Sequence, residues 1–263
     1  MNNNEATHEM YEQLGQDVLS GKIDIGTAAI VSGEQMEEFA NYRTKTELKH
    51  LRRVINFKDK KLLDLGCGPG RLSFEFAKKC KYVLGIDYSN SFIEIAKNNN
   101  KFENCDFKVG STTNFSCNEK FDIVFIGGVI LYLSDKEAIQ CIKNITDNYL
   151  ENNGIIICRE PIKYSKKSGR TNLEYLKMFS DSGLKNIYNK PTFLICPIYR
   201  FYKKCSEQKR KNSFYNQLFK ILFNINCFFD PFFLKFSKIY EKYFSKNWTI
   251  KQRFYIFKHS EDE

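Results

Sequence analysis

Three glycines, Gly66, Gly68 and Gly70, stand at alternate positions between an apolar segment and a helical one. The apolar residues 61–65 are typical of a buried strand, and residues 71–80 have the pattern of a helix. Glycine can adopt a positive φ and has no Cβ, so a ligand can lie directly against the main chain. The free N–H groups at the start of the helix would then bind a negative or polar group. This stretch therefore predicts a ligand cradle.

The spacing of the glycines narrows the kind of ligand. A dinucleotide fingerprint needs a small residue at position 71, where Arg71 stands, and an arginine there would block close packing of the helix on the strand. A P-loop needs Gly-Lys followed by Ser or Thr, which this stretch lacks. What remains is Gly-x-Gly-x-Gly with Asp64 two positions before its first glycine. The pattern disfavours NAD, FAD and P-loop nucleotide sites.

Together with three further segments, this pattern resembles the class I S-adenosylmethionine-dependent methyltransferases. Residues 64–70 resemble their first motif, and Asp87 ends the next strand-like run, 17 residues after Gly70. Residues 121–133, beginning Phe-Asp-Ile-Val-Phe, resemble the fourth strand and its loop, and residues 154–160 resemble the fifth strand. The resemblance covers about half of the chain, and it implies an enzyme that uses S-adenosylmethionine and releases S-adenosylhomocysteine.

The resemblance also implies where the cofactor binds. Asp87 would accept both ribose hydroxyls, as an ionised carboxylate can. Family members have an acid after the third strand for the adenine amino group; here Ser111 stands in that turn, so recognition would rely on backbone groups or on Thr112 and Thr113. An arginine on the helix before the first motif can pair with the methionine carboxylate. The predicted cofactor residues are Arg43, Asp64, Gly66, Cys67, Gly68, Gly70, Asp87, Tyr88, Ser111, Thr112, Thr113, Gly127 and Gly128.

Polar residues that follow the fourth and fifth strands are candidates for the acceptor side. Ligands of open α/β sheets lie beyond the carboxyl ends of the strands. We expect Tyr132 and Glu160 to be catalytic, with Glu160 as a general base or a ligand of a substrate hydroxyl. We expect Arg159 to contact an anion and Arg170 to reach a substrate phosphate. Arg159 and Glu160 could equally each be half of a structural ion pair.

From residue 61 onward, short apolar runs alternate with amphipathic segments. The apolar runs do not alternate internally, which suits parallel strands buried on both faces. This predicts a doubly wound α/β fold, and the resemblance implies a Rossmann-like, seven-stranded methyltransferase sheet. The expected strands are 61–65, 82–86, 106–109, 121–126, 155–158, 184–195 and 253–257, and the expected helices are 5–19, 34–55, 71–80, 90–100, 135–150 and 171–182.

Three regions follow from this pattern. Residues 1–60 are expected to be an N-terminal helical lid, and residues 61–198 with 249–258 the core. Residues 199–248 are expected to be a helical cap inserted before the last strand. Residues 199–258 hold 19 of the 40 aromatic residues of the chain, so the cap is expected to pack on the crevice. A sugar-stacking pocket, a homodimer interface or contact with a membrane surface would also use such a segment.

The positive charge gathers in the last part of the chain. Residues 159–263 contain 22 Lys and Arg against 9 Asp and Glu, a net of +13, whereas the whole chain carries +10. Such a surplus suggests an anionic partner, namely a phosphate-bearing substrate, nucleic acid or a membrane surface. A solvated basic face is the alternative. The sequence has no clear nucleic-acid-binding module.

The nine cysteines contain no Cys-x-x-Cys pair, and with only three histidines no metal pattern can be assembled. They indicate a reducing, cytoplasmic setting without disulfides. The first ten residues do not have the pattern of a signal peptide. The apolar stretch 218–236 is interrupted by Lys220, Asp230, Pro231 and Lys235, so no membrane span is expected there.

We therefore interpret the chain as a small-molecule methyltransferase. The cap-like extension and residues 127–133 and 158–161 look similar to methyltransferases of bacterial surface-polysaccharide biosynthesis, of capsule or lipopolysaccharide. That similarity favours a hydroxyl or amine of a sugar, a nucleotide-linked sugar or a phosphorylated precursor as acceptor. An RNA or protein methyltransferase that uses the basic C-terminal third, and a non-catalytic cofactor-binding scaffold, are the alternatives.

Overall fold

A computed structural model describes residues 3–23, 37–162, 170–192 and 252–260, with the backbone alone at 3–6 and 37–43. The expected cap at 199–248 lies outside these residues. A single seven-stranded sheet dominates the described part, with strand order β3-β2-β1-β4-β5-β7-β6. Its strands are β1 Lys61–Leu65, β2 Tyr82–Asp87, β3 Cys105–Val109, β4 Phe121–Gly127, β5 Leu150–Pro161, β6 Leu184–Pro191 and β7 Gln252–His259.

Strands β1 to β5 are parallel, and β7 runs antiparallel between β5 and β6. The carboxyl ends of β1, β2, β4 and β5 therefore share one edge of the sheet. The register places Leu65 beside both Ile86 and Ile126, and Gly127 beside Arg159. The residues that directly follow these strands are consequently neighbours in space.

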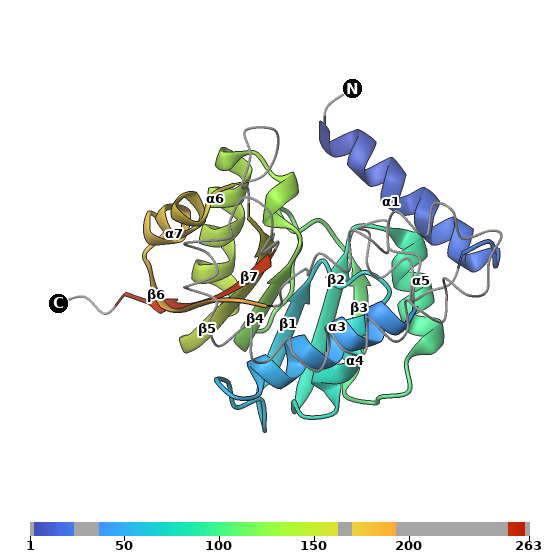
Figure 1. Cartoon of the computed structure of the whole chain (residues 1–263), viewed down its shortest axis with the longest axis horizontal. Helices are drawn as coiled ribbons and strands as arrows, with labels where there is room; N and C mark the ends of the chain where they lie inside the picture. Colours follow the sequence, from blue (N-terminus) through green and yellow to red (C-terminus); the bar gives the residue numbers. More distant parts are fainter. Residues whose placement is uncertain (1–2, 24–36, 163–169, 193–251, 261–263) are drawn as a thin grey trace, which may run out of the picture.

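Helices cover both faces of the sheet (Figure 1). On one face, α3 Glu37–Leu51, α4 Arg71–Ala77 and α5 Asn90–Asn99 contribute side chains to one apolar cluster. On the other face, α6 Asp135–Asn144 and α7 Asn172–Ser180 contribute to a second cluster. Within β1, Leu62 belongs to the first cluster and Leu63 to the second, so an uninterrupted apolar strand is explained by burial on both sides. The predicted doubly wound α/β fold is confirmed.

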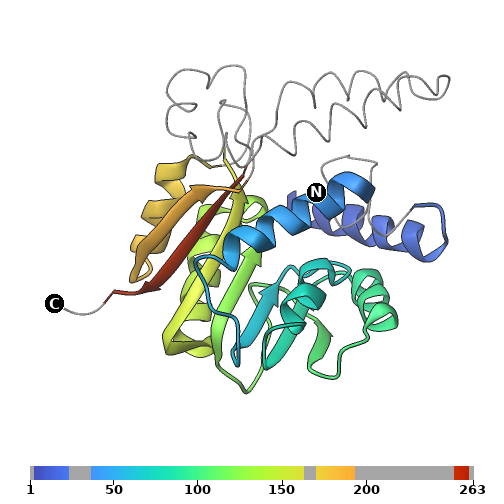
Figure 2. The ribbon, with the colours of Figure 1, turned by 60° about the horizontal axis from the view of Figure 1, so that its bottom comes forward.

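The helix α1, Asn3–Leu19, packs beside α5 instead of on the sheet (Figures 1 and 2). Tyr11, Leu14 and Val18 of α1 contact Phe92 and Ile95 of α5. Since α5 starts just after β2, this contact brings α1 to the carboxyl edge of the sheet.

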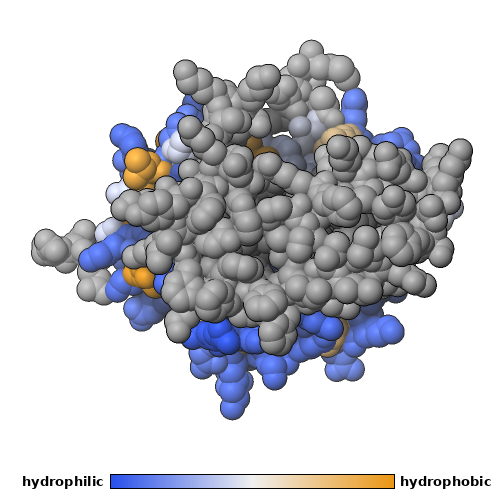
Figure 3. All heavy atoms as spheres, in the orientation of Figure 1, coloured by the Kyte–Doolittle hydropathy of each residue, from blue (hydrophilic) through white to orange (hydrophobic). Residues whose placement is uncertain are grey.

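The boundaries of the elements follow the expected ranges with one clear difference. β5 begins at Leu150, five residues before the expected start, and it includes the polar residues 151–153. A π-helical turn, Ile145–Tyr149, joins α6 directly to this strand. In the view of Figure 3, the described residues that are visible are mostly hydrophilic and their apolar side chains lie in separate spots.

Candidate active site

The glycine turn after β1 has the backbone conformation that only glycine adopts readily. Gly66, Gly68 and Gly70 have φ angles of 72°, 54° and 86°. The N–H groups of Gly66 and Cys67 donate to the carbonyl of Ile86 on β2, at 2.8 and 3.1 Å. The three glycines therefore have the positive φ angles that their spacing in the sequence predicted.

A second turn follows β4 and meets the first one. A Cβ added at Gly66 would lie 2.3 Å from Cγ2 of Val129, so the two turns touch at this point. A Cβ added at Gly68 or at Gly128 would meet no described atom within 4 Å. Gly128 also has a positive φ, 76°. Each of the two turns thus has a glycine whose Cβ position is open among the described residues, at the carboxyl edge of the sheet.

Asp87, at the end of β2, connects the glycine turn to the next helix. One carboxylate oxygen accepts from the N–H of Gly68 at 2.9 Å, and the other accepts from the N–H of Ser89 at 3.0 Å. Burial raises the pKa of this carboxyl, and these backbone donors oppose the shift. The N–H of Tyr88 acts in the same direction, so three backbone donors surround this carboxylate, which has about four acceptor positions.

Asp64 lies on β1 just before the glycine turn, and Cys67 lies within the turn. Asp64 is buried between β1 and α4, where its carboxylate accepts from Ser73 Oγ at 2.6 Å. Burial raises the pKa of Asp64 to about 6. The Cys67 thiol is buried, and burial raises its pKa well above the usual range. Asp64 therefore joins β1 to α4 through Ser73, and the buried Cys67 thiol is not a reactive nucleophile.

The turn after β3 lies next to Asp87, because the N–H of Gly110 donates to the Asp87 carbonyl at 2.9 Å. Ser111 and Thr113 share a hydrogen bond between their hydroxyls at 2.9 Å, and Thr112 is buried. The residues expected on the adenine side are thus brought to the same edge as the glycine turn.

The turn after β4 contains one turn of 3-10 helix, Ile130–Tyr132, and buried Glu160 contacts its start. One oxygen of Glu160 accepts from the N–H groups of Val129 and Ile130, both at 2.9 Å. Burial raises the pKa of Glu160 to about 7, a value that suits a general base. However, the side chain is 0% exposed, and its known contacts are with the backbone. This geometry favours a role in holding the turn.

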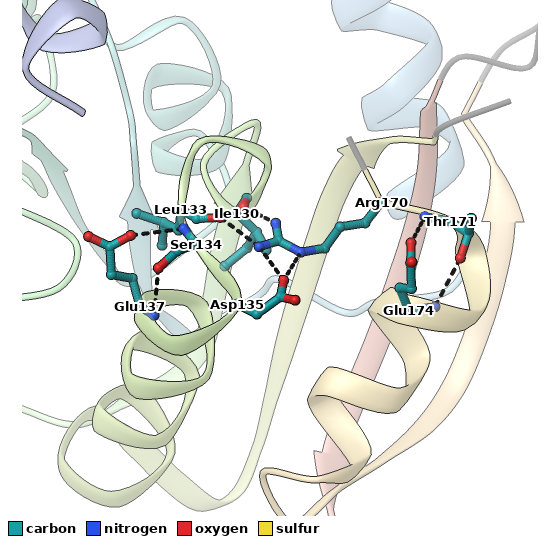
Figure 4. Close-up of polar contacts among 8 residues, drawn as sticks. All are labelled: Ile130, Leu133, Ser134, Asp135, Glu137, Arg170, Thr171 and Glu174. Atoms are coloured by element: carbon teal, nitrogen blue, oxygen red, sulfur yellow. Dashed lines mark hydrogen bonds and ion pairs between the residues drawn. The ribbon is translucent and has the colours of Figure 1, made fainter. Parts of the chain in front are cut away.

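Arg170 contacts the other end of the same turn (Figure 4). Its Nη1 donates to the carbonyl of Ile130 at 2.5 Å, and its Nη2 donates to the carbonyl of Leu133 at 2.6 Å. Its Nε donates to Asp135 at 2.9 Å, at the start of α6. All three guanidinium nitrogens therefore have protein partners, which differs from the expected contact with a substrate phosphate.

Arg159 takes part in a buried ion pair with α3. Its Nη1 lies 2.8 Å from a carboxylate oxygen of Glu47, and Arg71 lies 3.6 Å from the same oxygen. Arg71 also donates to Thr44. Two arginines against one carboxylate leave this cluster with one net positive charge among these three residues. The side chain of Arg43, expected to contact the cofactor, lies outside the described residues.

Sequence reasoning missed the polar contacts of α1. Glu12 accepts from Ser89 Oγ at 2.8 Å and from the N–H and hydroxyl of Ser91. Tyr11 and Tyr132 share a hydrogen bond between their hydroxyls at 2.6 Å. Tyr88, expected at the cofactor, donates to the carbonyl of Thr7 at 3.3 Å. An amphipathic pattern predicts a helix at 5–19, but it gives no sign of which polar residues face Asp87 and Tyr132.

The described residues form no candidate metal cluster and no membrane-spanning helix. No group of three or more His, Cys, Asp or Glu side chains there could hold a metal ion. No helix in the described ranges is both long and apolar enough to cross a membrane.

The sequence profile of a family described as "Methyltransferase domain" matches residues 56–220, which is more than half of the chain. The chain belongs to this methyltransferase domain family. The membership confirms the methyltransferase class that the glycine turn and Asp87 predicted, and S-adenosylmethionine is the cofactor of that class.

Individual relatives match only part of this methyltransferase chain. A probable cobalt-precorrin-6B C(15)-methyltransferase of Methanocaldococcus jannaschii is 38% identical over 90 residues, which are 31% of this chain and 49% of that protein. Phosphoethanolamine N-methyltransferase 1 of Caenorhabditis elegans is 31% identical over 104 residues, 39% of this chain and 22% of that protein. The chain thus spans about half of the first relative and about a fifth of the second.

A solved structure extends the likeness of the fold to nearly the whole methyltransferase chain. The [4+2]-cyclase SpnF superposes with a TM-score of 0.61 and 15% identity, covering 97% of this chain and 96% of that one. That protein is named as a cyclase, so this fold by itself does not determine the reaction. The reaction has to be argued from the residues at the carboxyl edge of the sheet.

Proposed function

We propose that this chain transfers a methyl group from S-adenosylmethionine to a small-molecule acceptor. The observation that carries the proposal is the contact between Gly68 and Asp87. The main-chain N–H of the glycine turn donates to the carboxylate that ends β2, beside the open space above Gly68. The family membership supports the same reaction class.

The residues present suit this cofactor. A Cβ at Gly68 or at Gly128 would project into open space, so the main chain leaves room for a ligand at each of these glycines. We propose that Asp87 accepts the ribose hydroxyls, since a carboxylate oxygen can accept more than one hydrogen bond. We place the adenine near residues 111–113 and the methionine part along Gly127 and Gly128, with Arg43 as a partner for its carboxylate. When bound, S-adenosylmethionine supplies an activated methyl group.

The protein has to position the acceptor for in-line attack on the methyl group, and it has to allow the acceptor to lose a proton. The acceptor oxygen or nitrogen bonds to the methyl carbon as the carbon–sulfur bond breaks, and an acceptor hydroxyl also loses its proton. We propose that Tyr132 contacts the acceptor, because it is 36% exposed and its hydroxyl bonds to Tyr11. We assign Glu160 to the support of Tyr132. Because Arg159 is already paired with Glu47, we assign the expected anion contact to the net positive charge that Arg159 and Arg71 keep against this one carboxylate.

For the acceptor itself, we propose a hydroxyl or amine of a sugar, a nucleotide-linked sugar or a phosphorylated precursor, in surface-polysaccharide biosynthesis. The +13 surplus of residues 159–263 supports an anionic acceptor. The name of one relative, phosphoethanolamine N-methyltransferase 1, points to a small phosphorylated amine and widens the range to be tested. A reducing cytoplasmic setting agrees with six free thiols, five of them buried, among the described residues.

The first experiment compares S-adenosylhomocysteine with NAD in a thermal-shift assay. S-adenosylhomocysteine is expected to raise Tm and NAD is not. A screen with methyl-labelled S-adenosylmethionine then tests nucleotide sugars, phosphoethanolamine and total RNA as acceptors. Labelling of RNA, with binding that weakens steeply as salt rises, would favour the RNA methyltransferase alternative. Binding of S-adenosylhomocysteine without labelling of any acceptor would favour the scaffold.

The substitution Asp87→Ala tests the cofactor site directly. It removes a carboxylate that would bond two ribose hydroxyls, and hydrogen bonds to charged groups contribute about 1.5–3 kcal/mol each, so affinity for S-adenosylhomocysteine is expected to fall at least ~100-fold. Isothermal titration calorimetry measures this affinity. Asp106→Ala is the matched control, because Asp106 is exposed on neighbouring β3 and bonds only Tyr82 among its described contacts. Unchanged affinity in Asp87→Ala would show that the ribose lies elsewhere.

A further inference from the structure

The turn Val129–Leu133 has few hydrogen bonds of its own. Tyr132 N–H donates to the Val129 carbonyl at 3.0 Å, and Leu133 N–H donates to the Ile130 carbonyl at 3.2 Å. A turn this short has backbone groups at both ends without internal partners. Its shape therefore depends on what other segments supply.

Two oppositely charged side chains supply those partners from distant parts of the chain. Glu160, on β5, accepts the N–H groups at the start of the turn, and Arg170, before α7, donates to the carbonyls of Ile130 and Leu133. Charged groups form the stronger kind of hydrogen bond to backbone. Figure 4 shows the guanidinium of Arg170 reaching across from the α7 side to this turn and to Asp135.

Arg170 is itself fixed in place. It forms an isolated backbone bridge with Ile162 at the end of β5. The next residue, Thr171, begins α7 with a capping box: its hydroxyl accepts from the N–H of Glu174, and the Glu174 carboxylate accepts from the N–H of Thr171. The side chain of Arg170 is buried, whereas Asp135 is largely exposed. The arginine is thus a rigid support, and Asp135 contributes little to holding it.

We propose that Arg170 is a positioning residue of the active site, which rests on the proposed function. It holds the turn in the form that presses Val129 against Gly66 and directs Tyr132 towards Tyr11. Through Val129 it shapes the cofactor cradle, and through Tyr132 it shapes the acceptor side. We propose this role in place of the contact with a substrate phosphate that was expected from the sequence. The guanidinium nitrogens of Arg170 that would bind the phosphate already donate to the protein.

Hydrogen–deuterium exchange on the full chain tests the proposal without any knowledge of the acceptor. Arg170→Gln removes two charge-assisted bonds to carbonyls of the turn, so exchange at residues 129–133 is expected to accelerate at least ~10-fold. Arg170→Lys keeps the charge but can satisfy fewer carbonyls, so an intermediate acceleration is expected. Lys177→Gln is the control, because Lys177 lies on α7 and is exposed in a 3.9 Å pair with Asp181.

Affinity for S-adenosylhomocysteine separates positioning from a purely structural role. Loosening the contact between Val129 and Gly66 is expected to weaken binding about 5-fold in Arg170→Gln, with partial recovery in Arg170→Lys and no change in Lys177→Gln. If Arg170→Gln does not fold, the Arg170→Lys variant gives the same two readouts. Wild-type exchange rates at 129–133 in these variants would overturn the proposal, and so would faster exchange with unchanged affinity. A wild-type protein that binds no S-adenosylhomocysteine would refute the proposed function, and the exchange rates would still show whether Arg170 holds the turn.

Discussion

The glycine turn 66–70 and the turn 129–133 face each other at the carboxyl edge of the sheet, and they are held in different ways. The first owes its shape to its own residues, since three glycines adopt positive φ. The second contains bulky residues and owes its shape to Glu160 and Arg170, which lie far away in the sequence. The two meet where Val129 contacts Gly66.

This difference separates two ways of building a binding site. A turn whose conformation is encoded locally can be identified from a short motif, and it tolerates change elsewhere. A turn held by distant charges has no local signature, and substitutions outside it can alter it. The proposed active site combines both kinds, so its proposed cofactor side and acceptor side should respond differently to substitution.

The substitution with the largest expected effect is Gly66→Ala, which breaks the contact between the two turns. An alanine at a φ of 72° costs about 1–2 kcal/mol, and its Cβ would overlap Cγ2 of Val129 at 2.3 Å, which adds about 1–3 kcal/mol. The free energy of unfolding is expected to fall by about 4 kcal/mol, measured by urea denaturation.

The matched control is Gly183→Ala. Gly183 has a φ of 78°, and an added Cβ there would meet nothing within 4 Å, so only the backbone cost of about 1–2 kcal/mol should appear. Equal losses in the two variants would show that the contact between Gly66 and Val129 is not tight. A larger loss in Gly66→Ala would confirm that the two turns are packed together.

Glu160→Gln tests the buried support of the second turn through its pH dependence. Burial raises the pKa of Glu160 to about 7 from an ordinary value near 4.5. Between these pH values the folded protein holds a proton that the unfolded chain has lost, so stability falls as pH rises through this window. At about 1.36 kcal/mol per pKa unit, the loss is about 3 kcal/mol and is complete above pH 7.

Glutamine accepts the same two backbone N–H groups but does not ionise. The variant is therefore expected to match the wild type near pH 4.5 and to exceed its stability by about 3 kcal/mol at pH 8. Asp64, whose pKa is also raised, is present in both proteins and cancels in the difference. The groups that face Glu160 are Arg159 on its own strand and Tyr175 on α7, and both remain. Parallel pH profiles would show that Glu160 ionises normally in the folded protein.

The sequence predicts the locally encoded parts well. The positive φ values of the glycine turn follow from the spacing of the glycines, and the position of Asp87 follows from the apolar run before it. The sheet was predictable because apolar residues such as Leu62 and Leu63 must be buried on opposite faces. The early start of β5 was not predictable, because residues 151–153 are polar and exposed. The strand begins where Leu150 pairs with Phe121, and its register with β4 is irregular before Ile155.

The parts that depend on distant partners could not be read from the sequence. A charge directly after a strand, as at Arg159 and Glu160, signals a polar position at the carboxyl edge but not its partner. Glu160 contacts backbone N–H groups, Arg159 contacts Glu47, and Arg170 contacts carbonyls. In each case the partner is more than 25 residues away, so only the folded chain shows that these charges hold other segments in place.

The smallest expected effect concerns the hydrogen bond between Tyr11 and Tyr132, which connects α1 to the second turn. It lies at the surface, where a hydrogen bond contributes about 0.5–1 kcal/mol, so Tyr11→Phe should lower stability by no more than that. A double-mutant cycle with Tyr132→Phe isolates the coupling energy from other effects of each substitution. A measurable coupling would show that α1 is fastened to the turn 129–133 through Tyr11 at Tyr132, in addition to the start of α5 through Glu12 at Ser89 and Ser91. No coupling would mean that α1 is held at this edge by Glu12 and by the bond from Tyr88 to Thr7, and not by Tyr11. The acceptor side could then open without disturbing the residues beside Asp87.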